Sequence, residues 1–109
     1  MSKYTLPGGI VKACAGIVEG VTAEPYRTHI ANAGRVVGEN YALTESGQKE
    51  RERLTEAIKL NLINRREYPF EYLARRYNLP VSLATFKREK MKYCYTLAVL
   101  CGFVDNVSR

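Results

Sequence analysis

The stretch YPFEYLARRYNLPVSLATFKREKMKYCYTLAVLCG, from Tyr68 to Gly102, decides the fold that we expect for this chain. Apolar residues follow helical spacing on both sides of residues 78–81 (NLPV), where the proline prevents a helix from continuing and the asparagine tolerates the left-handed conformation of a helix end. The first helix is expected to begin at Pro69, and the second follows Ser82, a good N-cap residue. The stretch therefore predicts a helix-turn-helix.

The second helix of this unit is predicted to have two unlike faces. Its apolar face, counted at i, i+3, i+4 and i+7, carries Leu83, Phe86, Lys90, Tyr93, Leu97, Leu100 and Cys101. From Tyr93 to Cys101 the helix is apolar nearly all round, so this half is expected to be buried in the domain or against a partner. Gly102 is expected to end the helix.

The opposite face gathers small and polar residues near its N-terminus, where a DNA-recognition helix meets base edges and phosphates. Ser82 and Thr85 have hydroxyls that can donate to phosphates or bases, and Ala84 lets the helix approach the groove floor. Arg88 suits a bidentate contact to guanine, and Lys87 and Lys92 suit contacts to the phosphate backbone. The candidate DNA-binding residues are Ser82, Ala84, Thr85, Lys87, Arg88, Lys92, Arg75 and Arg76.

Positive charge is concentrated in the same stretch. The chain has a formal net charge of +6, and from Arg65 to Tyr95 eight basic residues against three acidic ones account for +5 of it. Such a segment is the electrostatic footprint of a protein that binds the phosphate backbone, and a solvated basic face is the alternative. Arg65 and Arg66, together with the two arginines of the first helix, would clamp the phosphates that flank the groove.

The rest of the chain predicts a single all-α domain of 109 residues. Residues 1–47 are expected to hold an N-terminal helix and an irregular connection, residues 48–67 a central helix, and residues 68–102 the helix-turn-helix. The N-terminal helix starts at Ile10, after Pro7-Gly8-Gly9 as a stop to regular structure. Its stripe is Ile10, Ala13, Cys14, Ile17, Val18 and Val21, with Gly20 as a plausible end.

Two further segments differ in how clearly they are patterned. Between Thr22 and Gly47 a short helix at residues 26–33 is one alternative, and residues 35–40 fit a strand end, a turn or a loop equally well. The central helix is expected to end near Arg65-Arg66. Its core-facing stripe is Leu54, Ala57, Ile58, Leu62 and Ile63.

Several classes of function find no support in the residues. The three cysteines are odd in number and form no CxxC pair, so they are expected to be reduced core residues of a cytoplasmic protein. The lone His29 has no zinc partners at ligand spacing, and no metal or other cofactor is expected. Without a glycine-rich phosphate loop or paired carboxylates in an apolar setting, we expect no enzyme. No signal peptide or stretch of transmembrane length is present, so no membrane partner is expected.

Residues 63–73 (INRREYPFEYL) and the helix from Ser82 to Cys101 resemble small regulators encoded by phages and prophages of Gram-positive bacteria. The nearest group is the ArpU/RinA-type late transcriptional regulators, whose C-terminal part is similar to the promoter-reading helix-turn-helix of bacterial sigma factors. The resemblance covers roughly residues 54–104. Pro80 departs from the small or glycine residue that is common in sigma-like turns, and residues 1–47 match no group.

The resemblance implies a transcriptional regulator of phage or prophage genes that binds double-stranded DNA, with RNA polymerase and a second copy of the chain as further candidate partners. The rival hypothesis is a phage assembly or adaptor protein, in which the apolar end of the last helix contacts another protein. An RNA-binding protein is a third alternative, because a basic helical face does not itself distinguish the two nucleic acids.

Overall fold

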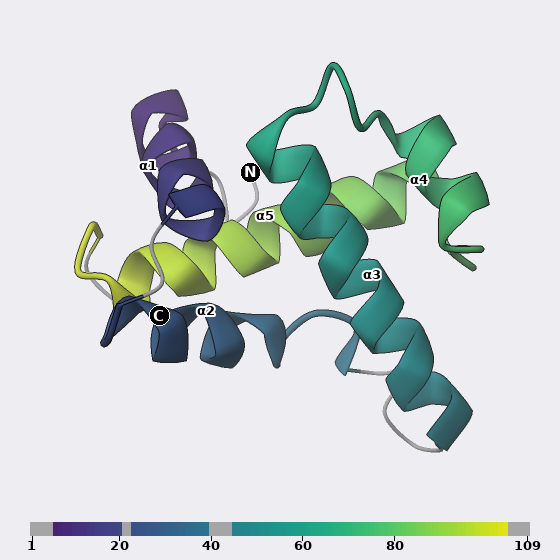
Figure 1. The fold of residues 1–109 in the computed structure, drawn as a ribbon, viewed down its shortest axis with the longest axis horizontal. Helices are drawn as coiled ribbons and strands as arrows, with labels where there is room; N and C mark the ends of the chain where they lie inside the picture. Colours follow the sequence, from purple (N-terminus) through teal and green to yellow (C-terminus); the bar gives the residue numbers. More distant parts are fainter. Residues whose placement is uncertain (1–5, 21–22, 40–44, 105–109) are drawn as a thin grey trace.

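A long C-terminal helix, α5 (Leu83–Leu100), runs through the middle of the molecule (Figure 1). The computed structural model describes residues 6–20, 23–39 and 45–104, and within these ranges the chain forms five α-helices and no strand. The other four helices are α1 (Gly8–Gly20), α2 (Tyr26–Gly34), α3 (Glu45–Ile63) and α4 (Phe70–Arg76). α5 packs against α1, α2 and α3, and α4 packs against α3. The predicted all-α class is confirmed.

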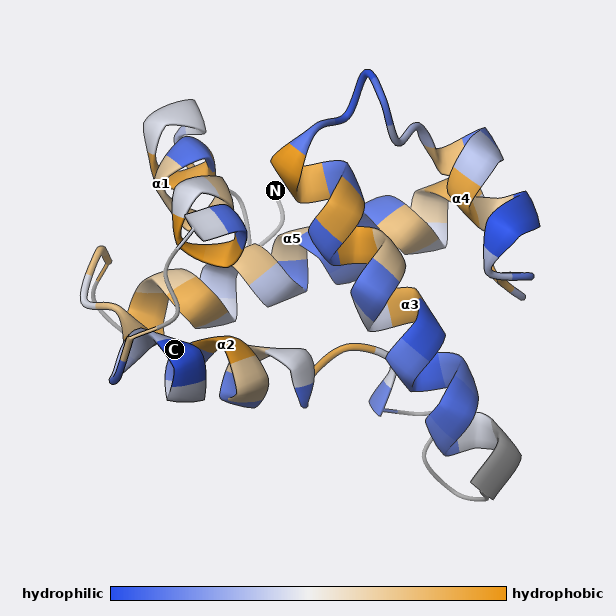
Figure 2. Cartoon of the chain, viewed as in Figure 1, coloured by the Kyte–Doolittle hydropathy of each residue, from blue (hydrophilic) through white to orange (hydrophobic). Residues whose placement is uncertain are grey.

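The core lies where α1, α2 and α3 meet the second half of α5. α5 contributes Tyr93, Cys94, Leu97 and Ala98, all fully buried. The other helices and the turn after α2 supply the remaining fully or almost fully buried members, which include Cys14, Ala33, Val37, Leu54, Ala57, Ile58 and Leu73. In Figure 2 the C-terminal half of α5 is hydrophobic, whereas the N-terminal half of α3, which extends beyond the core, is hydrophilic. The apolar half of α5 is thus buried against helices of its own chain.

The predicted apolar face of α5 is confirmed in its middle and wrong at its ends. Phe86, Tyr93 and Leu97 are buried as expected. Leu83 and Leu100 are 41% and 36% exposed, because they lie in the first and last turns, beyond the helices that cover the middle of α5.

The start of α1 differs from the expectation. The two glycines after Pro7 do not stop regular structure but form the first turn of the helix. The backbone N–H groups of Ile10 and Val11 donate to the Pro7 carbonyl, at 3.0 and 3.2 Å. Proline is well suited to a helix start, because an N–H there has no partner within the helix. Cys14 and Ile17 of the predicted stripe are buried, and Val21 lies outside the described residues.

The central helix is shifted toward the N-terminus relative to the prediction of residues 48–67, since α3 runs from Glu45 to Ile63. Asn64 ends it: its side-chain oxygen accepts from the Glu67 N–H at 3.1 Å, and its carbonyl accepts from the Tyr68 N–H at 2.9 Å. A side-chain turn of this kind competes with helical hydrogen bonding. Arg65 and Arg66 therefore lie in an exposed turn rather than in the last turn of the helix.

The connection from α2 to α3 begins with a turn. Of the strand end, turn and loop that the sequence allowed for residues 35–39, the structure therefore shows the turn. The turn is held from both sides: the Arg51 side chain donates to the carbonyls of Val37, at 2.9 Å, and Arg35, while the buried Glu89 accepts from the Gly38 N–H at 2.7 Å. Gly38 has a φ of 58°, a conformation that costs other residues about 1 kcal/mol. Residues 40–44 lie outside the described ranges.

The expected ends of α4 and α5 are confirmed. Asn78, just after α4, has a φ of 51°. Ser82 caps α5, because its Oγ accepts from the Thr85 N–H at 3.2 Å. At the other end Gly102 has a φ of 79°, and the Phe103 N–H returns to the Ala98 carbonyl at 2.8 Å. Within the described ranges, no helix is long and apolar enough to cross a membrane.

Candidate nucleic-acid interface

The first two turns of α5 extend beyond the core, next to α4 (Figure 1). In this part of the helix only Phe86 and Glu89 are buried. Phe86 packs on Phe70 of α4, with ring centroids 5.1 Å apart, and this contact fixes the two helices relative to each other. The exposed residues of the same turns are Ser82, Leu83, Ala84, Lys87 and Arg88.

The exposed side chains of these two turns point in two different directions around the helix axis. Ala84 and Arg88 are four residues apart and therefore share a face, opposite the buried Phe86. Lys87 lies about 100° around the helix from Arg88. Within the described part of the chain, neither Lys87 nor Arg88 makes a hydrogen bond or an ion pair, so both cations face solvent.

Ser82 and Thr85 are occupied with each other. Besides the cap, the Ser82 hydroxyl donates to Thr85 Oγ1 at 3.2 Å. Thr85 is half-buried, whereas Ser82 is exposed. Their first task is thus to hold the start of α5.

Lys92 does not belong to this exposed surface. Its side chain is only 15% exposed, and its Nζ lies 3.2 Å from Glu89 Oε1 and 3.7 Å from Glu39 Oε1. The expected contact of Lys92 with the phosphate backbone assumed a free side chain one turn beyond Arg88. The structure instead pairs this lysine with the buried Glu89 and with Glu39 of the turn after α2.

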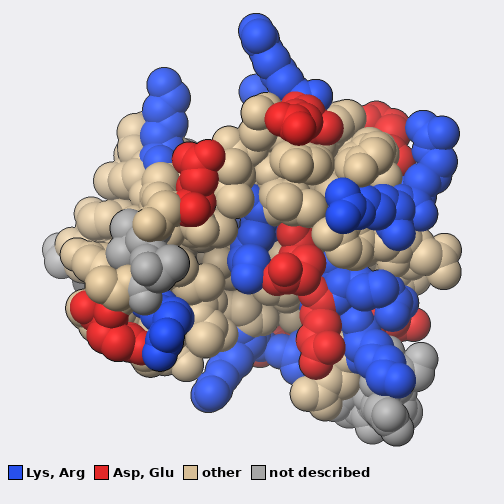
Figure 3. Space-filling model, viewed as in Figure 1, with Lys and Arg blue, Asp and Glu red and all other residues tan. Residues whose placement is uncertain are grey.

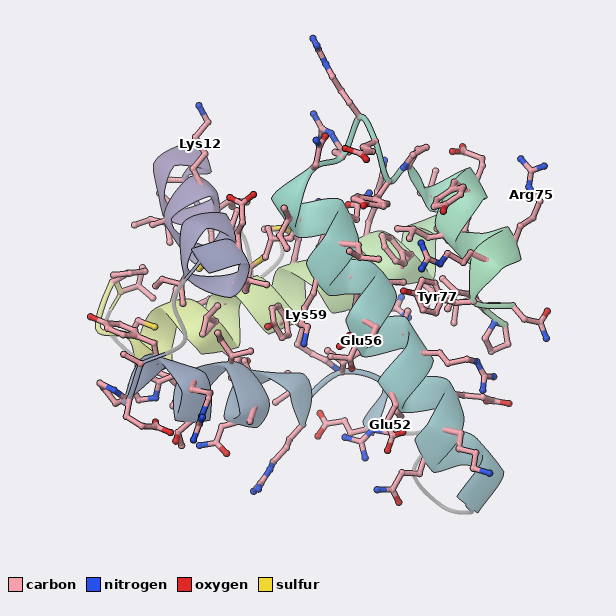
Figure 4. All side chains as sticks on the ribbon, in the orientation of Figure 1. Lys12, Glu52, Glu56, Lys59, Arg75 and Tyr77 are labelled. Atoms are coloured by element: carbon pink, nitrogen blue, oxygen red, sulfur yellow. The ribbon has the colours of Figure 1, made fainter. Side chains whose placement is uncertain are left out.

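Arg75 and Arg76 are exposed in the last turn of α4. Arg75 extends into solvent (Figure 4), with its Nε 3.4 Å from the Glu71 carbonyl. Arg76 donates to the Tyr72 hydroxyl at 3.1 Å and lies 5.4 Å from the ring centroid of Tyr77. The hydrogen bond to Tyr72 raises the pKa of Arg76, so the guanidinium stays charged. Both arginines present positive charge beside the start of α5.

The side of α3 next to α2 carries mixed charge and offers a contrast. Glu52, Glu56 and Lys59 lie along it (Figure 4), and the Lys59 ammonium pairs with Glu56 at 2.8 Å. Figure 3 shows acidic and basic atoms interleaved on this side of the molecule. A polyanion would meet repulsion here, so the exposed end of α5 with α4 is the better candidate surface.

A groove of about 450 Å³ borders this surface where α1, the end of α3, α4 and α5 meet. Lys90 lies in it: its Nζ donates to the Asn61 side chain at 2.6 Å, and Asn61 in turn donates to the Tyr68 carbonyl at 2.8 Å. Burial lowers the pKa of Lys90; the nearby Cys94 opposes this shift, and the charges of Arg65 and Lys87 make smaller contributions that lower it. Sequence patterning correctly placed Lys90 on the packed face of α5.

Two buried polar residues, Asn61 and Glu89, were missed by the sequence analysis. Asn61 falls on the apolar stripe of α3, four residues after Ala57, and a polar residue on such a stripe is the signal that would have identified it. Glu89 gives no comparable signal, because its partner Gly38 lies 51 residues away.

The cysteines and His29 give no sign of a metal site, and the described residues contain no cluster of three or more potential metal ligands. Burial raises the pKa of Cys14 to about 12 and that of Cys94 to about 11, which keeps both thiols protonated at neutral pH. They serve as core residues. No protein-family model, curated protein or solved structure matches the chain.

Proposed function

We propose that this chain binds double-stranded DNA with the exposed start of α5 and, without any enzymatic activity, regulates transcription of phage or prophage genes. The observation that carries the proposal is a capped helix end on which Lys87 and Arg88 face solvent without partners among the described residues, while the second half of the same helix is fixed in the core. A helix held rigid in this way loses little conformational freedom when it binds.

The roles within the surface follow from the directions of the side chains. Arg88, on the outermost face with the small Ala84, suits the base edges of a major groove, where arginine recognises guanine through two hydrogen bonds. Lys87, Arg75 and Arg76 suit the phosphates on either side. Lys92 has no part in this set, because it is engaged with Glu89 and Glu39.

The partners and location follow from the same proposal. A regulator of this kind works in the cytoplasm and acts together with RNA polymerase, and a second copy of the chain would read a second half-site. An RNA duplex is a poorer fit, because its deep, narrow major groove does not admit side chains.

The experiment is a selection of bound duplexes from a random DNA pool, followed by affinity measurements on the selected duplex with Arg88→Ala. We expect this variant to weaken binding by about 1–3 kcal/mol and to relax the preference at one base pair. Arg27→Ala is the matched control, because Arg27 is 74% exposed, lies on α2 and pairs only at the surface with Glu24. Full specific affinity of the Arg88 variant, or no enriched duplex, contradicts the proposal.

A further inference from the structure

The groove beside the start of α5 combines an apolar floor with three cations. Phe70, Phe86 and Met91 line it together with Leu83, which is 41% exposed. Arg65, Lys87 and Lys90 border the same space. The groove thus places an apolar floor within a basic rim.

Lys90 is the most informative residue of the groove. Its ammonium has three N–H donors, and within the described part of the chain its one hydrogen-bond partner is the neutral Asn61 side chain, at 2.6 Å. No carboxylate there forms an ion pair with it, although Glu71 lines the same groove. Partly buried charges in proteins are normally paired, because desolvation without compensation is costly.

The position of this charge is fixed rather than accidental. Asn61, only 5% exposed, is held by its hydrogen bond to the Tyr68 carbonyl and holds Lys90 in turn. Arg65 and Lys87 are near enough to lower the pKa of Lys90. Both therefore repel the charge of Lys90, and an anion in the groove would relieve that repulsion.

The chemistry of the floor decides what kind of anion fits. DNA presents hydrated phosphates on a convex surface, and its apolar contacts are made mainly by the thymine methyl group, which is too small to cover Phe70, Leu83 and Met91. A peptide can place a large apolar side chain on the floor and a carboxylate beside Lys90 at the same time. The groove's volume of about 450 Å³ lies within the range of sites for small ligands and short peptide anchors.

We infer that the groove between α3, α4 and α5 binds an acidic peptide segment of a partner protein, with an apolar side chain on the floor of Phe70, Leu83 and Met91 and a carboxylate paired with Lys90. This partner site goes beyond the proposed binding of DNA and would connect a DNA-bound regulator to a second protein. Lys87 borders both surfaces, whereas Arg88 belongs to the DNA face alone.

The test begins with selection from a random peptide pool against the full chain. We expect the enriched peptides to carry Asp or Glu next to a large apolar residue. Lys90→Gln keeps a donor for Asn61 but removes the charge, and it should weaken the best peptide about tenfold or more. Lys12→Ala, which removes one charge from the outer side of α1 (Figure 4), should leave the affinity unchanged.

A charge reversal keeps the test decisive if Lys90→Gln folds poorly. Arg65→Glu combined with Lys87→Glu alters only exposed side chains, and a new selection against this variant should enrich basic-apolar peptides instead of acidic ones. Enrichment that ignores charge, or no enrichment with either protein, overturns the inference.

The two binding proposals can fail separately. Arg88→Ala should weaken the selected duplex and leave the acidic peptide bound as before. Lys90→Gln should weaken the acidic peptide and leave the affinity for the selected duplex unchanged. If Lys90→Gln weakens the duplex as much as Arg88→Ala does, and no acidic peptide binds, the groove is part of the DNA surface and the inference is wrong.

Discussion

Tyr93 combines complete burial with a hydroxyl that has no hydrogen-bond partner among the described residues. Burial also raises the pKa of this phenol, which therefore stays protonated. An unsatisfied buried polar group costs about 1–3 kcal/mol. Burial of the Tyr93 ring thus stabilises the core, whereas burial of its hydroxyl without a partner is destabilising.

Tyr93→Phe should accordingly stabilise the protein, by about 1 kcal/mol, because it removes the unsatisfied hydroxyl and keeps the ring. The free energy of unfolding in urea measures the effect. Tyr72→Phe is the matched control: its hydroxyl is at the surface and accepts from Arg76, so a change within about 0.5 kcal/mol is expected. Lower stability of the Tyr93 variant would show that the hydroxyl is satisfied in solution.

Single residues were predictable where their role is local. Asn78 and Ser82 act on backbone groups within a few positions, and the sequence was enough to assign both. The ion pairs of Lys92 were not predicted: Glu89 lies three residues earlier on the same helix, and Glu39 belongs to a turn more than 50 positions earlier in the chain. The partner of Lys90 was not predicted either, since Asn61 lies on another helix.

At the scale of elements, α5 joins a buried half and an exposed half in one helix. The repeat of apolar residues predicted the buried half, because burial of a helix face leaves a periodic pattern. The pattern could not show which helices cover it, or that its first and last leucines are exposed. The short α2 was one alternative among several, because its apolar stripe is weak and only Ala33 is fully buried.

Substitutions of Ser82 can distinguish the structural role of the exposed half of α5 from its proposed role in DNA binding. Ser82→Ala removes the cap and should lower the free energy of unfolding by about 1 kcal/mol. Ser82→Asp keeps a good cap and favours the helix dipole, so stability should be retained. The new negative charge should nevertheless weaken DNA binding, because it faces the phosphates. Urea unfolding and duplex affinity are measured on both variants, and unimpaired DNA binding by Ser82→Asp would contradict the placement of this helix end against DNA.

At the scale of the whole molecule, charge is arranged unevenly around the core. The stretch from Arg65 to Tyr95 holds +5 of the total +6, but the fold divides these cations among different tasks. Lys92 is paired with Glu89, Lys90 lies in the groove, and the two arginines of α4, Lys87 and Arg88 are exposed. A count of charge along the sequence located the basic region, and only the structure showed which of its members are free to meet a partner.

The salt dependence of DNA binding tests this arrangement. Three cations are assigned to phosphates, Lys87, Arg75 and Arg76, so the logarithm of the affinity should fall with the logarithm of salt concentration at a slope of about −3. Arg75→Ala should reduce that slope by about 1 and weaken all duplexes alike, because a phosphate contact does not distinguish sequences. Arg27→Ala should leave the slope unchanged, since its cation lies on α2. If Arg75→Ala and Arg27→Ala behave alike, α4 takes no part in the interface, and the DNA contact is confined to α5.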